Sequence, residues 1–439
     1  MMYRPTSAEE TADRTPSRFR IALRHISGVH PSPHVALLSR DPETGKIRDV
    51  LDGVTLERAL DGSWATPWMT VVADEEDRDA PWLRGEALLS RLGDVVELRF
   101  RAGAGRPRFS HRTVGTRSKD GGELAILALN VRATVLRTAV GGPPSVGGDA
   151  RGAVRVIEDQ LDVLDGVLAQ CHVKVRPRKE PMIAIADPPG PALVHIGGMY
   201  GLAASGGEIR LAVDGRKIEP LCSERGAKPQ DTARRLSEAL MARGFETTVA
   251  LNAHTGREAY PTSDVVVRRK DGSLAAVGPW AKGVAISSDS SQPVEIAAVD
   301  LSDGLDAYGA EEIGLGTLEE RALLRAFGSP EKGIDFFVVG RFSDGAKQGE
   351  SFLANGAIGP AVILDGRGIA RARQAYALAH EVAHVLLGDP GHPDDSGDGR
   401  TWLLMNSRSA SARFGPKRIT AEECGIIRDN ASGLLEPLD

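Results

Sequence analysis

The chain has 439 residues, of which 41% are hydrophobic and 26% are charged, which is typical of a soluble globular protein with about two to four domains. The net charge is −6 and only 5% of the residues are aromatic, which argues against a basic or base-stacking surface for nucleic acid. No run of 18 apolar residues could span a membrane, and the polar N-terminus lacks the apolar core of a secretory signal. We therefore expect a cytoplasmic protein by default, with export by a signal-independent route as the alternative.

The first part of the chain is expected to be rich in β-strands. Residues 1–18 are polar and predict a disordered tail. Residues 19–118 hold short apolar segments separated by turn signals, which predicts a mostly-β accessory module. A helical period occurs there only at 81–92. His30 and His34 form the one histidine pair in this module, and a Pro-rich turn between them favours a role without metal.

An α/β layer is predicted next, at 119–187. Residues 123–137 are almost continuously apolar and predict a central strand. After a Gly/Pro loop, apolar residues recur at spacings of three and four, as on one face of a helix: Val154, Ile157, Leu161, Leu164, Leu168 and Cys171. Residues 172–176 then alternate like a strand. This strand–helix–strand order is typical of α/β proteins.

The three cysteines are expected to be unpaired. Cys171, Cys222 and Cys424 lie far apart and include no Cys-x-x-Cys pair, so neither a thiolate zinc finger nor a disulfide framework is predicted. The helical spacing places Cys171 in the hydrophobic core.

Residues 188–297 are predicted to be a small inserted α+β domain. Turn signals at 214–215 and 270–272 each indicate a β-hairpin, and residues 231–243 predict a helix that ends at Gly244. The α/β pattern resumes at 298–439, with predicted helices at 318–327, 369–387 and 421–429 and strands at 335–340 and 359–364. Together with 119–187 this part is expected to form one catalytic domain.

The sequence HEVAH at residues 380–384 carries the strongest chemical signal. Histidines four residues apart lie on the same side of a helix, so His380 and His384 can bind one metal ion. Glu381 is close enough to accept a proton from a metal-bound water. His392 follows in the turn after the helix and offers a third ligand. Three protein ligands leave one position open, which is typical of catalytic zinc.

Residues 380–392, HEVAHVLLGDPGH, resemble the motif of the metzincin zinc metalloproteases. The likeness includes two helix histidines, a catalytic glutamate, a turn glycine at Gly388 and a third histidine. Downstream, residues 403–406 (LLMN) resemble the Met-turn beneath the metal, with Met405 as its methionine. The resemblance implies a zincin-like catalytic domain with one zinc ion bound by His380, His384 and His392.

The motif departs from the metzincin pattern in its loop. The glycine lies four residues after the second histidine rather than three, and the third histidine lies eight after it rather than six. Asp389, Asp394 and Asp395 are alternative third ligands, because carboxylates also bind zinc. A glutamate-zincin would instead use Glu422 or Glu423. The acidic loop at 394–398 predicts a solvated segment, with calcium binding as an alternative.

The resemblance implies an endopeptidase that hydrolyses peptide bonds with a metal-activated water and with Glu381 as general base. Its partner would be a protein or peptide substrate, paired as an extended chain with an edge strand within 349–363. Two alternatives remain open: a binding protein built on a zincin scaffold, and an effector protease that cleaves one specific protein. The sequence leaves the oligomeric state open.

Overall fold

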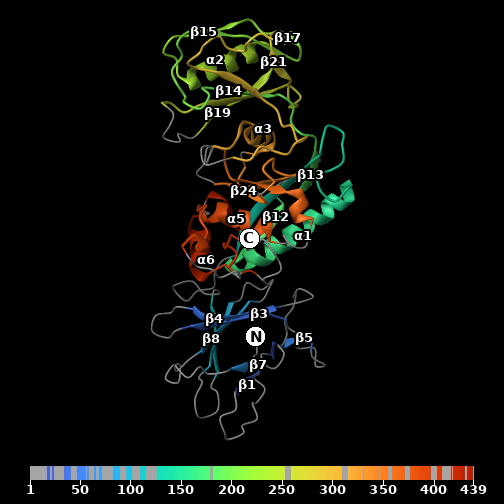
Figure 1. Ribbon diagram of the computed structural model, residues 1–439, viewed down its shortest axis with the longest axis vertical. Helices are drawn as coiled ribbons and strands as arrows, with labels where there is room; N and C mark the ends of the chain where they lie inside the picture. Colours follow the sequence, from blue (N-terminus) through green and yellow to red (C-terminus); the bar gives the residue numbers. More distant parts are fainter. Residues whose placement is uncertain are drawn as a thin grey trace.

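The computed structural model describes most of the chain after residue 125. Its described residues are 126–177, 181–252, 259–308, 315–329, 331–345, 347–353, 358–370, 376–396, 403–407, 417, 419–430 and 433–438, and the backbone of the strands before them. The strands of the N-terminal residues, the central sheet and the segment between residues 193 and 297 follow one another along the longest axis (Figure 1). In the described residues, no helix has the length and apolar character needed to cross a membrane. The coarse expectation of a mixed α and β protein is confirmed.

The central part of the molecule is a seven-stranded sheet. Its strands are β11 (Leu127–Leu136), β12 (Val173–Pro177), β13 (Ile183–Ala186), β23 (Ile334–Val339), β24 (Gly349–Phe352), β25 (Ala361–Asp365) and β26 (Leu435–Pro437). The order is β12-β11-β23-β25-β24, and β13 and β26 also pair with β11. β12, β11, β23 and β25 are parallel, whereas β24 at the edge is antiparallel to β25. The predicted strand at 123–137 is thus confirmed as a central one.

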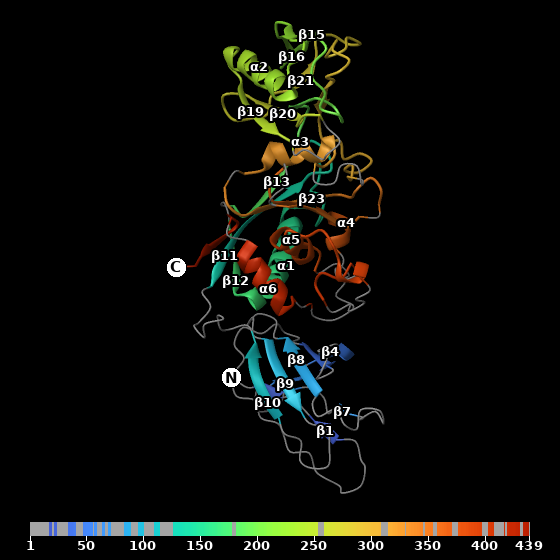
Figure 2. The ribbon, with the colours of Figure 1, turned by 90° about the vertical axis from the view of Figure 1, so that its left-hand side faces the viewer.

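Helices cover both faces of this sheet (Figure 2). On one face lie α1 (Ala150–Leu168), its continuation η2 (Ala169–Cys171), α5 (Ala377–Leu387) and α6 (Ala421–Asn430), and on the other lies α3 (Leu318–Phe327). β23 shows the division, since Phe336 and Val338 pack with α1 and α5 while Phe337 and Val339 pack with α3. A strand buried on both faces has a continuous apolar run, which explains why it could be predicted from the sequence.

The predicted helices of this part are confirmed with one change of boundary. The helix expected at 369–387 begins later, because Gly366–Ile369 forms a separate short helix, α4, and α5 starts at Ala377. Asp365 caps α4 by accepting a hydrogen bond from the Arg367 N–H at 2.8 Å. α6 begins with a capping box, in which Thr420 and Glu423 each accept the backbone N–H of the other.

The segment between β13 and α3 has its own sheets and core. Its strands are β14 (Leu193–Ile196), β15 (Gly207–Ile209), β16 (Leu211–Val213), β17 (Arg216–Lys217), β18 (Leu221–Ser223), β19 (Glu246–Leu251), β20 (Ser263–Arg268), β21 (Val277–Pro279) and β22 (Val294–Ala297). The four-stranded antiparallel sheet β19-β20-β14-β22 shares a core with α2 (Pro229–Ala242). Both predicted hairpin turns are present: Asp214 and Gly215 have the positive φ angles of a type I′ turn, and Arg269 N–H bonds to Ser273 O at 2.7 Å.

Strands also dominate the described backbone of the N-terminal residues. They are β1 (Ser17–Phe19), β2 (Ala22–Leu23), β3 (His34–Arg40), β4 (Ile47–Thr55), β5 (Glu57–Arg58), β6 (Trp64–Ala65), β7 (Met69–Val71), β8 (Leu83–Leu88), β9 (Val95–Phe100) and β10 (Phe109–Val114). The helix that the period at 81–92 indicates is not formed. Residues 83–88 are strand β8, which pairs with β9 along its whole length, and that pairing outweighs a weak local pattern. The predicted tail ends early, at β1, and residues 1–16 lie outside the described residues.

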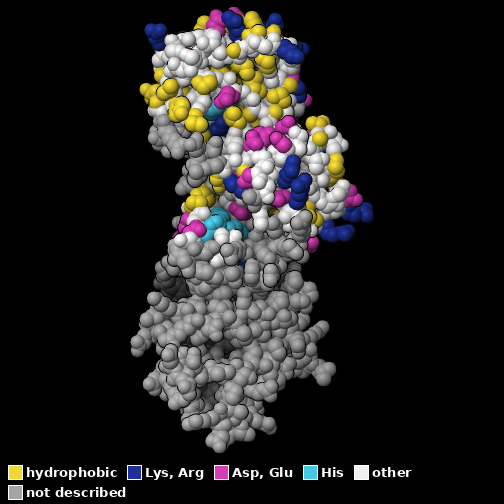
Figure 3. Space-filling model, viewed as in Figure 1, with side chains coloured by type: hydrophobic (Ala, Val, Ile, Leu, Met, Phe, Trp, Pro, Cys, Tyr) yellow, Lys and Arg dark blue, Asp and Glu magenta, His cyan; other side chains and the backbone are white. Residues whose placement is uncertain are grey.

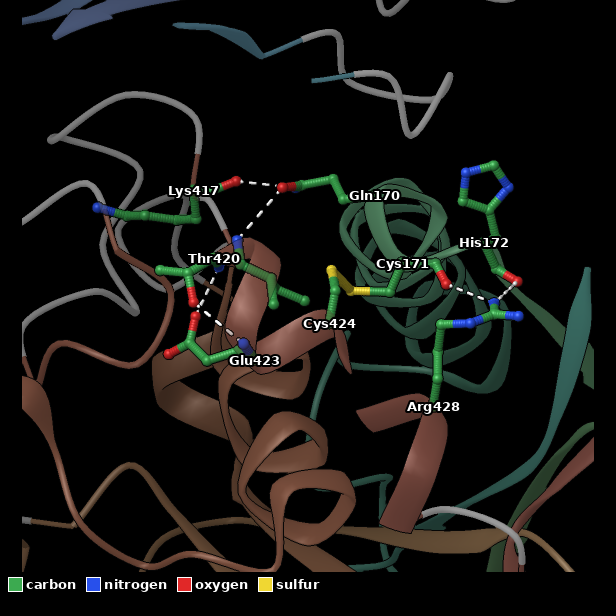
Figure 4. The surroundings of a disulfide bond; sticks show 9 residues. Gln170, Cys171, His172, Lys417, Thr420, Glu423, Cys424 and Arg428 are labelled. Atoms are coloured by element: carbon green, nitrogen blue, oxygen red, sulfur yellow. Dashed lines mark hydrogen bonds between the residues drawn. A yellow bond between two sulfur atoms is a disulfide. The ribbon is translucent and has the colours of Figure 1, made fainter. Parts of the chain in front are cut away.

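The expectation of unpaired cysteines is wrong for two of the three. Cys171 at the end of η2 forms a disulfide with Cys424 on α6, across a sequence separation of 253 residues (Figure 4). The predicted core position of Cys171 is confirmed, since it is 1% exposed. The bond could not be read from spacing, because only the packing of α6 beside α1 brings the two residues together. Cys222 is free and exposed.

Candidate metal centre

Helix α5 and the turn after it bring three histidines to one point. His380 and His384 are buried on consecutive turns of α5. The helix ends at Gly388, whose left-handed φ of 68° reverses the chain, and the following loop returns His392 to the helix. The Nε2 atoms of the three imidazoles are each 3.2 Å from the other two. Among the described residues, this is the group of side chains that could hold a metal ion.

Backbone carbonyls fix the orientation of two of the imidazole rings. His380 Nδ1 lies 2.7 Å from Leu404 O, and His384 Nδ1 lies 2.7 Å from Asp389 O. A carbonyl oxygen can only accept, so each Nδ1 carries the proton and donates it. The Nε2 atom of each neutral ring then presents a lone pair toward the common point. Metal-binding histidines usually donate the proton of their other ring nitrogen to such a carbonyl oxygen, which fixes the orientation of the ring.

The spacing of the nitrogens fits a tetrahedral ion. Tetrahedral zinc with Zn–N distances of about 2.0–2.1 Å needs nitrogens about 3.3 Å apart, and the observed separation is 3.2 Å. Burial, and then the neighbouring His380, lowers the pKa of His384 to about 4, which keeps the ring neutral and able to bind a cation at pH 7. The three histidines therefore have the geometry that a metal ion requires, and His384 also has the neutral ring.

The described acidic side chains near this group have other partners. The Asp389 carboxylate accepts the Gly391 N–H at 2.8 Å, and the Asp395 carboxylate accepts the His392 N–H at 3.0 Å. Both bonds shape the loop that presents His392. Glu423 caps α6 instead of pointing to the histidines. The side chains of Asp394 and Glu422 lie outside the described residues, so their part in the alternative ligand sets stays open.

The turn at 403–406 contacts the first of the three histidines. Leu404 supplies the carbonyl that orients His380. Met405 is 3% exposed and belongs to the same hydrophobic core as α5. The backbone N–H of Asn406 closes the turn on Leu403 O at 3.4 Å. This turn therefore connects the hydrophobic core to the His380 ring, and Met405 contributes by packing in that core.

Glu381 points to the edge strand β24. Its Oε2 accepts a hydrogen bond from the Ser351 hydroxyl. Burial raises the pKa of Glu381, while the neighbouring His384 and the hydrogen bond from Ser351 oppose that rise. Ser351 and Gly349, which touch Glu381, were not identified from the sequence as side-chain partners. The sequence indicated only that a strand near 349–363 borders the site.

The candidate centre is open to solvent on one side. Figure 3 shows histidine side chains, in cyan, at the surface of the central part next to acidic side chains. The His392 side chain is 26% exposed, whereas His380 and His384 are buried. Among the described residues, His195 lies apart from this group and pairs with buried Asp264 at 2.9 Å, whereas the side chains of His30 and His34 lie outside the described residues.

Comparison with known proteins adds no family to this description. No protein-family model, no curated protein and no solved structure matches the chain.

Proposed function

We propose that the protein is a zinc-dependent endopeptidase. One observation carries the proposal: three histidine Nε2 atoms 3.2 Å apart lie beside a glutamate that follows the first histidine on the same helix. An all-histidine donor set favours zinc among the common divalent ions. When bound, zinc would lower the pKa of a water molecule and polarise the substrate carbonyl.

Glu381 is placed to act as the general base. It follows His380 directly on α5, and its carboxylate lies between the helix and β24. Burial raises its pKa above the ordinary value of a glutamate, toward the range in which a carboxylate can accept a proton and later return it. In peptide hydrolysis Glu381 would take the proton of the attacking water and deliver it to the leaving amine.

The free edge of β24 suits an extended peptide substrate. The Asp365 N–H donates to Gln348 O, so the main-chain N–H and C=O groups of the even-numbered residues of β24 point toward β25. Those of Gly349 and Ser351 point to the outer edge. No strand pairs with that outer edge among the residues that the structure describes. A substrate strand could therefore pair with the edge beside Glu381 by β-augmentation.

Replacing Glu381 with glutamine tests the proposal directly. Glu381→Gln keeps the shape of the side chain but removes the base, so zinc content should stay at one ion per chain and peptide cleavage should fall by about 10²–10⁴-fold. Glu208→Gln, an exposed glutamate paired with Arg210, is the matched control and should cleave normally. Retained cleavage in Glu381→Gln would refute the base. A zinc-loaded wild-type protein that cleaves no peptide of a diverse library would favour the binding-protein alternative.

A further inference from the structure

The edge strand contacts the Glu381 carboxylate with a side chain that the proposed reaction does not itself need. The Ser351 hydroxyl lies in hydrogen-bond contact with Glu381 Oε2 and 2.9 Å from the Glu381 main-chain oxygen. One hydroxyl has one proton to donate. A carboxylate is the stronger acceptor, so Ser351 donates to Oε2.

Gly349 brings the same strand against the other carboxylate oxygen. A Cβ atom at position 349 would lie 2.7 Å from Glu381 Oε1 and 2.8 Å from its Cδ, closer than real Cβ contacts occur. Gly349 and Ser351 lie two residues apart and therefore face the same side of β24. One residue leaves room for Oε1 and the other holds Oε2, so β24 determines both the position and the rotation of the carboxylate.

We propose that Ser351 is a positioning residue for Glu381, which holds the carboxylate against the strand whose outer edge receives the substrate. The assignment rests on the proposed function, since it gives Glu381 the role of base. Gly349 and Ser351 present their main-chain groups to the free edge and their other side to Glu381. A peptide paired with β24 would thus be registered directly against the base, with no intervening element.

A merely structural role for Ser351 makes a different prediction. If the hydroxyl only joined β24 to α5, its loss would lower stability without changing how Glu381 meets a ligand. Acetohydroxamic acid separates the two roles, because it chelates zinc and its hydroxyl donates to a neighbouring carboxylate. Its binding to the zinc-loaded protein, measured by calorimetry, requires no turnover.

For the zinc-loaded protein, Ser351→Ala should weaken acetohydroxamate binding about tenfold, the effect of losing one hydrogen bond to a charged group. Ser351→Thr, which keeps the hydroxyl, should bind within about twofold of the wild type. In the Glu381→Gln background, Ser351→Ala should cause no further loss of affinity. Both changes act on one contact, the hydrogen bond from the hydroxamate hydroxyl to the Glu381 carboxylate. With a cleaved peptide, kcat should fall about tenfold while KM stays within about twofold.

Two results would overturn the assignment of Ser351. Either Ser351→Ala binds the hydroxamate as tightly as the wild type, or its loss adds fully to that of Glu381→Gln. Gly349→Ala is an independent check, since its methyl group would displace Glu381 and should weaken hydroxamate binding even with Ser351 present. A wild-type protein that shows this binding pattern but cleaves no peptide would refute the peptidase and leave the contact between Ser351 and Glu381 established.

Discussion

Removing the disulfide between Cys171 and Cys424 should cost the protein a large part of its stability. The bond joins η2, the continuation of α1, to α6. Hydrogen bonds run alongside it: Gln170 bonds to Lys417 O and to Ile419 N–H, and Arg428 donates to Cys171 O at 2.9 Å (Figure 4). These bonds should keep α6 in place in the reduced protein, so the loss should come mainly from the unfolded chain.

The magnitude follows from the length of chain that the bond closes. In the loop-entropy description, a closed loop of 253 residues lowers the entropy of the unfolded chain enough to stabilise the fold by about 5.5 kcal/mol at 25 °C. Measured values for single disulfides extend to about 5 kcal/mol. We therefore expect the double variant Cys171→Ala, Cys424→Ala to lose about 4–5 kcal/mol, including the small loss of buried sulfur contacts.

Urea denaturation of the double variant and of the wild type, with and without dithiothreitol, measures this loss. Cys222→Ser is the matched control. Because Cys222 is exposed and free, this variant should unfold like the wild type. A difference below about 1 kcal/mol, with no effect of the reductant, would refute the reasoning. Because such bonds persist mainly in oxidising compartments, a large effect would favour export over the cytoplasmic default.

Three further predictions concern single side chains. Burial alone would raise the pKa of Asp289, but the hydrogen bonds donated by Ser205 and Ser223 outweigh it and lower the pKa from 3.8 to about 2. Its contribution is therefore full above pH 4 and is lost as the pH falls through 2. Asp289→Asn should lower stability by about 2 kcal/mol at pH 7 and flatten its acid dependence, and an unchanged acid slope would contradict the prediction. Gly388→Ala should lower stability to thermal unfolding by about 1 kcal/mol and weaken zinc binding. The space around Gly388 is open, but its φ of 68° is strained for alanine, and equal stability would contradict that strain. Asp264→Ala should cost about 3–5 kcal/mol in urea, since it leaves buried Arg321 and partly buried Arg325 on α3 without their 3.6–3.7 Å partner, and a loss below 1 kcal/mol would contradict it.

Features encoded over a few residues could be predicted from the sequence. The structure places α3 and α6 where the sequence predicts helices, and each begins with a capping box, at Thr317 and Thr420, which is a local signal. The pairing of His380 with His384 also follows from helical geometry alone. The structure brings His392 to the same group as His380 and His384, and it places Met405 in the hydrophobic core.

Contacts between distant segments could not be predicted in this way. Cys171 meets Cys424 only after α6 packs on η2, and a serine in a strand such as Ser351 gives no sign that it will meet Glu381. Glu350 is the clearest case: a charged residue of an edge strand would be expected at the surface, yet it is 2% exposed beneath α3. Burial and the facing Glu320 raise its pKa, while the ion pair with Lys347 opposes that rise.

The central claim, that His380, His384 and His392 hold one zinc ion, is tested most directly by metal titration. Wild-type protein stripped with a chelator and titrated with zinc against a competing indicator should bind one ion per chain. His392→Ala should bind zinc more than about 100-fold more weakly, beyond the usual effect of changing a residue that only orients a ligand. Asp395→Ala, which removes the hydrogen bond to the His392 N–H and the 3.7 Å contact with its ring, should lose far less. One-to-one binding of undiminished affinity in His392→Ala would contradict the account and indicate a carboxylate of the same loop as the third ligand.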